Sequence, residues 1–99
     1  MRIWTTRQYR DWILGLRDRQ ARARIDVRVD RLAHGNPGSH RQLRDGVSEL
    51  KIDFGPGYRV YYTVRDGEIV VLLAGGDKST QSRDIELAVS LAKNLDANL

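Results

Sequence analysis

The spacing of apolar residues changes at Gly35-Asn36-Pro37-Gly38, and this change constrains the fold more than any other feature of the sequence. Before the motif, apolar residues recur every three or four positions, as on one face of a helix. After the motif they alternate with polar residues, as in strands that pack on one side. Gly and Pro in this motif also end a helix. The sequence therefore predicts helices first and a sheet second, which is the α+β class.

A first helix is expected to start at a capping box in Thr5-Thr6-Arg7-Gln8, with Thr5 as the N-cap and the Gln8 side chain reaching back to it. Tyr9, Trp12 and Leu16 follow at helical spacing and give this helix one apolar stripe. The helix is expected to end near residue 16 or 17. A short strand is expected ahead of it.

The segment from residue 18 to residue 34 allows two interpretations. Apolar and charged residues alternate over residues 21–30, which is a strand pattern. Ala21, Ile25 and Val29 also lie on one helical face, and the Ala and Arg residues favour a helix. Arg22 can pair with acids four residues away on either side. We therefore predict a second helix over residues 18–34.

The second half of the chain predicts three or four antiparallel strands and a last helix. Residues 47–54 and 58–65 alternate cleanly, and Asp66-Gly67 is a strong hairpin signal. Residues 69–74 are continuously apolar, as in a strand covered on both faces. Residues 40–44 fit a short edge strand, and the stripe from Ile85 to Leu95 fits the helix. With 99 residues, the chain is expected to form a single domain over residues 1–99.

Positive charge is concentrated in the first half of the chain. Residues 1–45 hold 11 Arg and 5 Asp, whereas residues 46–99 hold 6 basic and 8 acidic residues. Such a first half favours a polyanion or an acidic protein as partner; a solvated, Arg-rich helix pair is the alternative. No cysteine is present, which excludes disulfides, thiolate metal sites and a Cys nucleophile. No apolar run fits a signal peptide or a membrane span, so a cytoplasmic protein without a membrane partner is expected.

Polar side chains on one face of the predicted hairpin are the best candidates for chemistry. Glu49 and Lys51 on one strand and Arg59 and Tyr61 on the next should share this face. Because the apolar residues of the same strands point the other way, we expect the polar face to be an open patch. A solvated face with cross-strand ion pairs is the alternative interpretation.

Cleavage of RNA without a metal requires a base for the 2′-hydroxyl proton, cations for the transition state and an acid for the leaving oxygen. Glu49 could be the base and Lys51, Arg59 and Lys78 the cations. Tyr61 could stack on an unpaired base. Further candidates for contact with RNA are Asp77, Arg41 and Arg44.

Two other motifs carry weaker signals. Gly75-Gly76-Asp77-Lys78 lies between a strand and a helix, where backbone amides can hold an anion, although an ordinary connecting loop is the better interpretation. His34 and His40 have no third metal ligand near them in the sequence, so no metal site is expected.

Four motifs follow one another along the chain: Leu32-Ala33-His34-Gly35-Asn36-Pro37-Gly38, Val47-Ser48-Glu49-Leu50-Lys51-Ile52, Gly55-Pro56-Gly57-Tyr58-Arg59-Val60-Tyr61-Tyr62, and Gly75-Gly76-Asp77-Lys78-Ser79-Thr80-Gln81. Together they resemble the addiction-module killer proteins, which are HigB-like, phage Gp49-like members of the RelE/ParE toxin superfamily. The resemblance extends over nearly the whole chain. It implies a RelE-like fold, in which two N-terminal helices pack on a sheet and a variable helix follows.

The resemblance also implies a toxin that is neutralised by a cognate antitoxin with a helix-turn-helix DNA-binding domain. RelE-type members cut mRNA on the ribosome with basic residues of the central strands, without a metal or cofactor. Arg59 matches the arginine of their Gly-Tyr-Arg strand start, and Lys51 and Lys78 lie near two of their basic positions.

The sequence departs from the RelE pattern at two positions. Their second strand lysine is Ile52 or Asp53 here, and their C-terminal tyrosine has no counterpart after Tyr62. Glu49 or Asp77 therefore becomes a stronger candidate for acid–base chemistry. The alternatives are the ParE branch, whose members inhibit DNA gyrase, and an inactive protein that only binds its antitoxin.

Overall fold

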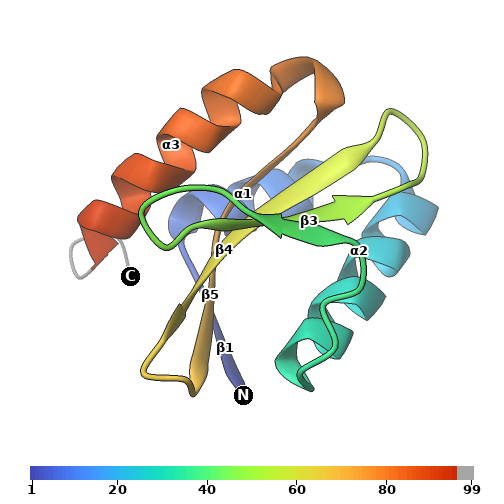
Figure 1. The fold of residues 1–99 in the computed structure, drawn as a ribbon. Coiled ribbons are helices and arrows are strands. Elements are labelled where there is room, and N and C mark those ends of the chain that lie inside the picture. The colour runs from blue at the N-terminus through green and yellow to red at the C-terminus, as the bar shows by residue number, and fades with distance from the viewer. Residues whose placement is uncertain (96–99) are drawn as a thin grey trace.

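A sheet of five strands forms the centre of the molecule, and helices cover both of its faces (Figure 1). The structure is a computed structural model, and it describes residues 1–95. The elements are β1 (Arg2–Thr5), α1 (Arg7–Gly15), α2 (Arg19–Ala33), β2 (His40–Gln42), β3 (Ser48–Ile52), β4 (Tyr58–Arg65), β5 (Ile69–Asp77), a 3-10 turn (Lys78–Thr80) and α3 (Gln81–Lys93).

The predicted α+β fold is confirmed, including the order of its elements. The strand order is β1-β5-β4-β3-β2, in which β2 to β5 are antiparallel and β1 runs parallel to β5. The second helix is confirmed: Asp18 caps it by accepting from the amides of Gln20 and Ala21, and it ends before Gly35, whose φ is +86°. Within residues 1–95, no helix has both the length and the apolar character that crossing a membrane requires.

The N-cap of α1 is Thr6, so the prediction of Thr5 was wrong by one residue. Thr6 Oγ1 accepts from the Tyr9 amide at 3.1 Å and donates to the Leu73 carbonyl at 2.6 Å. Thr5 cannot take this role because it belongs to β1, where it lies opposite Leu72. The helix also ends earlier than predicted, at Gly15.

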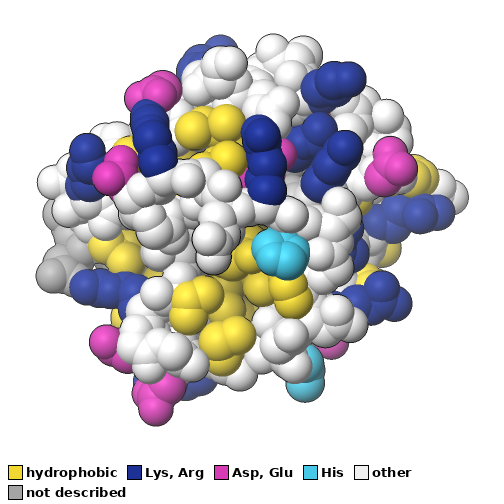
Figure 2. Space-filling model, viewed as in Figure 1, with side chains coloured by type: hydrophobic (Ala, Val, Ile, Leu, Met, Phe, Trp, Pro, Cys, Tyr) yellow, Lys and Arg dark blue, Asp and Glu magenta, His cyan; other side chains and the backbone are white. Residues whose placement is uncertain are grey.

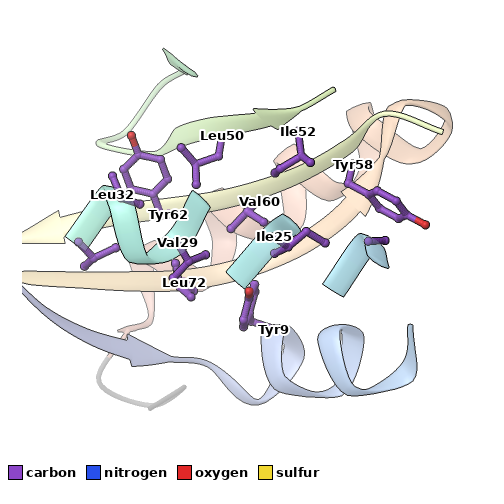
Figure 3. Packing of buried hydrophobic residues seen from close by; sticks show 12 residues of the cluster. Tyr9, Ile25, Val29, Leu32, Leu50, Ile52, Tyr58, Val60, Tyr62 and Leu72 are labelled. Carbon is purple, nitrogen blue, oxygen red and sulfur yellow. The ribbon is translucent and has the colours of Figure 1, made fainter. Parts of the chain in front are cut away.

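One face of the sheet packs against α1 and α2 mainly through apolar side chains and tyrosines. Figure 3 shows Tyr9 of α1 and Ile25 of α2 pointing toward residues of β3, β4 and β5. The helical stripe and the strand alternation found in the sequence meet here. We call this cluster the α2-side core; its buried members are Tyr9, Ala21, Ile25, Val29, Leu32, Leu50, Ile52, Tyr58, Val60, Tyr62, Val70 and Leu72.

The other face is covered by α3, so the prediction of an open polar patch there was wrong in part. Tyr61 and Val71 of this face are fully buried beneath Ala88 and Val89 of α3. The register between β4 and β5 shifts here: Tyr61 pairs with Ala74 and Tyr62 with Leu72, which leaves Leu73 as an extra residue. We call this cluster the α3-side core; its buried members are Val47, Tyr61, Ile69, Val71, Leu73, Ala74, Ala88, Val89, Leu91 and Leu95.

Gly75 and Gly76 let other groups approach β5 closely. A Cβ on Gly75 would lie 2.1 Å from the Trp12 ring, and one on Gly76 would lie 1.8 Å from Asp84 Oδ2. Asp77 caps the 3-10 turn that follows, since its side chain accepts from the Ser79 amide at 2.8 Å. These contacts indicate that the segment is an ordinary connecting loop packed against its neighbours rather than a loop that binds an anion.

Candidate functional site

The register of the sheet aligns two rows of side chains on the face that α3 covers. In the first row, Arg41 of β2 lies opposite Glu49 of β3, which lies opposite Tyr61 of β4. In the second row, Lys51 of β3 lies opposite Arg59 of β4. Directly opposed residues of antiparallel strands share a face. The sheet therefore brings together two of the predicted catalytic cations, the predicted carboxylate and one predicted RNA contact, Arg41.

Glu49 is the centre of this group and is only 2% exposed. Its Oε1 lies 2.9 Å from Arg59 Nε, and its Oε2 accepts from Arg41 Nε at 3.1 Å. Gln81 of α3 donates from Nε2 to both oxygens, at 3.0 and 3.2 Å. A buried carboxylate needs such partners, because burial without them costs several kcal/mol, on the order of what a domain can lose before it unfolds.

Arg59 is held from two sides and is 5% exposed. Its Nη1 donates to the carbonyl of Gly57 at 2.9 Å, while its Nε faces Glu49 as an ion pair without the angle of a hydrogen bond. Gly57 has a φ of +81°, and a Cβ there would lie 3.3 Å from Arg59 Nη1. The Gly-Pro-Gly turn thus leaves room for the guanidinium beside the backbone.

An open pocket of about 320 Å³ lies over these residues, between β2, β3, β4 and the start of α3. Figure 2 shows Lys and Arg side chains gathered on this part of the surface, near the start of α3. Lys51 and Arg41 are exposed there, whereas Glu49 and Arg59 form the buried side of the pocket. Three cations oppose one carboxylate, so the pocket favours an anionic group such as a phosphate. Its lining consists of Ser39, His40, Arg41, Glu49, Lys51, Arg59 and Gln81.

Sequence reasoning did not identify Gln81 as part of this site. Gln81 is remote from Glu49 in the chain, and only the packing of α3 on the sheet brings the two together. His40 also lines the pocket, but it lies opposite Leu50, whose side chain belongs to the α2-side core. By the alternation of strands, the imidazole lies on the face away from Glu49.

Tyr61 cannot stack on an RNA base in this structure, so that prediction is corrected. Its ring is fully buried in the α3-side core, and its hydroxyl has no hydrogen-bond partner within residues 1–95. Burial, followed by the negative charges of Glu49 and Asp84, raises the pKa of Tyr61. The alternation of β4 indicated the correct face for Tyr61 but not that a helix covers it.

Three further candidates lie outside the pocket. Arg44 forms an ion pair with Glu86 of α3, which raises the pKa of Arg44. Asp77 is engaged in its cap, where the hydrogen bonds of Ser79 lower its pKa. Lys78 is exposed and near Gly57, since a Cβ on that glycine would lie 3.6 Å from Lys78 Cβ. In the part of the chain that the structure describes, no three His, Cys, Asp or Glu side chains cluster as metal ligands would.

Fold and site together define a small α+β protein with a cationic pocket built around a buried carboxylate. Residues 11–94 match the sequence profile of the family described as "Phage derived protein Gp49-like (DUF891)". The chain belongs to this family, which is of the HigB/RelE-like toxin type.

A relative from Haemophilus influenzae, described as an uncharacterized protein, is 45% identical over 95 residues. The match covers 96% of this chain and 96% of that protein, so the two sequences align over almost their whole lengths. No solved structure is significantly similar to this chain. The family assignment therefore depends on the sequence profile together with the α+β fold.

Proposed function

We propose that this protein is the toxin of a type II toxin–antitoxin module and that it cleaves mRNA on the ribosome without a metal, which inhibits translation. The observation that carries this proposal is the arrangement of Arg41, Lys51 and Arg59 around one pocket. RNA cleavage passes through a transition state with extra negative charge on the phosphate. Fixed cations at the edge of a buried region stabilise such charge strongly, because water does not screen them fully.

Arg59 and Lys51 are the proposed phosphate ligands, since they lie opposite each other and both line the pocket. Glu49 fits the role of a positioning residue better than that of a free base. Both of its oxygens already accept from neighbouring donors, and its side chain is buried. In this role Glu49 orients Arg59 and Arg41 toward the substrate.

The experiment that tests the activity is induction of the wild-type protein in cells, followed by mapping of mRNA 5′ ends. We expect new ends within coding regions, together with arrested growth, because the cleavage would act on translated messages. Intact transcripts in cells that have stopped growing would contradict the ribonuclease proposal.

The proposed protein partner is an antitoxin with a helix-turn-helix DNA-binding domain, encoded beside this chain. The Arg residues of α1 and α2 form a basic surface that an acidic segment of this antitoxin could match, and Trp4, Trp12 or α3 could supply apolar contacts. Co-expression with the product of the adjacent reading frame, with a tag on one chain only, tests the pairing. Elution of this chain alone at moderate salt would contradict it.

Inhibition of DNA gyrase is a second candidate function, because the sequence has no tyrosine after Tyr62 to match that of RelE-type ribonucleases. A supercoiling assay with purified gyrase separates the two candidates. The ribonuclease proposal predicts normal supercoiling at micromolar concentrations of this protein. Inhibition at such concentrations would favour the gyrase function.

A further inference from the structure

A second, larger groove runs along α2 on the face of the sheet away from the pocket. Its volume is about 560 Å³, and it lies between α2 and the end of β3. The residues of α2 that line it fall at positions 23, 24, 27, 28 and 31, which repeat with the period of one helix face. The side chains used below are Arg24, Val27, Arg28, Arg31, Asp53 and Phe54.

Apolar side chains are accessible along this groove. Val27 is 49% exposed although it is a large aliphatic residue on a regular helix. Phe54 is half-buried, and the Arg24 guanidinium lies over its ring at 4.4 Å from the centroid. A partner that covers the apolar surface of Val27 and Phe54 would gain binding free energy of about 25 cal/mol per Å² of that surface.

Positive charge predominates in the groove. Three arginines line it and Asp53 is its single acid. Arg31 forms no ion pair or side-chain hydrogen bond with any residue from 1 to 95. Burial, followed by the charge of Arg31, lowers the pKa of Arg28.

Arg28 gives the groove a fixed wall. It donates to the carbonyls of Lys51 at 2.6 Å, Ser39 at 2.8 Å and Pro37 at 2.9 Å. These bonds join α2 to the segment that leads into β2 and to the end of β3. Because these bonds already fix the Arg28 side chain, a partner that binds in the groove loses little free energy to ordering it.

We infer that this groove is the docking surface for an acidic, amphipathic segment of the antitoxin, an inference that rests on the proposed function. Carboxylates of that segment would pair with Arg24 and Arg31, and an apolar side chain would cover Val27. Single-stranded RNA fits the groove less well. Asp53 repels phosphates, and Arg24 already lies over the aromatic ring on which a base would stack.

The chain has no cysteine, so a Val27→Cys variant carries a unique thiol inside the groove. A matched control is Val64→Cys on β4, since Val64 is 43% exposed and lies outside the groove. The rate of reaction with a maleimide is measured for each variant, free and in complex with the product of the adjacent reading frame. We expect the complex to slow labelling at position 27 at least about tenfold and to leave position 64 within about twofold, because a docked side chain excludes the reagent.

The outcomes separate this inference from the proposed function. If the complex forms and position 27 still reacts at the free rate, or if both positions are protected equally, the groove is not the docking surface and the toxin assignment stands. If no complex forms, the antitoxin pairing fails and the docking surface fails with it. Protection of position 27 by a single-stranded RNA oligonucleotide alone would overturn the choice of a protein partner.

Charge reversal provides an independent measurement. The double variant R24E/R31E should weaken the complex at least about tenfold, since close charge pairs across an interface couple strongly. The control R2E/R65E makes the same change of charge at two exposed residues of β1 and β4 outside the groove, and it should leave the affinity within about twofold. Equal affinities for R24E/R31E and wild type would overturn the inference.

Discussion

The two faces of the sheet are built differently. The α2-side core contains only apolar side chains and tyrosines, whereas the face under α3 joins an apolar cluster to a buried ion pair. Leu50 and Glu49 are neighbours on β3 and show the contrast directly. Leu50 points into the α2-side core, and Glu49 points toward Arg59 and Gln81. One face therefore stabilises the fold, and the other also holds charged groups at the edge of a pocket.

The largest effect on stability is expected from Glu49→Ala. Removing the carboxylate leaves the buried Arg59 cation without its partner, which costs about 3–5 kcal/mol. Urea unfolding followed by circular dichroism measures this loss. Lys51→Ala is the matched control: Lys51 is exposed in the same pocket, so its loss should change stability by about 0.5 kcal/mol or less. Equal stabilities for the two variants would show that the buried pair is not structural.

The neighbouring variant Leu50→Ala should cost about 3 kcal/mol, since it opens a cavity in the α2-side core. RNA cleavage per folded molecule should remain at the wild-type rate, because Leu50 does not line the pocket. Glu49→Ala should lower that rate as well as stability. If Leu50→Ala lowers the rate per folded molecule as much as Glu49→Ala does, the division of roles between the two faces is wrong.

Alkaline pH should lower the free energy of unfolding through the buried tyrosines on both faces of the sheet. Burial raises the pKa of Tyr9 in one core and of Tyr61 in the other above the usual value of about 10. The folded state keeps these phenols protonated. Their contribution to the free energy of unfolding is therefore complete below pH 10 and is lost as the pH rises further. At pH 11 the free energy of unfolding should fall by about 1 kcal/mol for each tyrosine. Unfolding curves at pH 9 and pH 11 provide the test, and no difference between them would contradict it.

The smallest effect is expected from Tyr61→Phe at neutral pH. The Tyr61 hydroxyl is buried without a hydrogen-bond partner, so its removal should raise stability by about 1 kcal/mol. RNA cleavage should not change, because the ring is inaccessible to substrate. A loss of cleavage with intact stability would restore the role of Tyr61 in contact with RNA.

The α2-side half of the fold could be predicted from the sequence because each signal there is local. The stripe of α2 and its end at Gly35 follow from spacing and from the residues that stop helices. The continuous apolar run of β5 also indicated that both faces of the sheet are covered. The polar residues of β3 instead suggested that one face is open to solvent. Alternation alone does not distinguish an open face from one that a helix covers in part.

The site was predictable in composition but not in geometry. Alternation and strand pairing bring Glu49, Lys51 and Arg59 to one face, which could be inferred from the sequence. The burial of Glu49 depends on Gln81, whose position follows from the packing of α3 and from no local motif. Exposure is a property of the whole assembly of helices and sheet, so it could not be inferred from the pattern of one hairpin.

The most direct test of the central claim is the rate at which Arg59→Ala cleaves mRNA on purified ribosomes, measured per folded molecule against wild type. Arg83→Ala is the matched control, since Arg83 is an exposed arginine outside the pocket. The account predicts a loss of about 10²–10³-fold for Arg59→Ala, comparable to the removal of a transition-state donor, and no loss for the control. A wild-type rate for folded Arg59→Ala would contradict the account, because the pocket would then contribute nothing to the reaction.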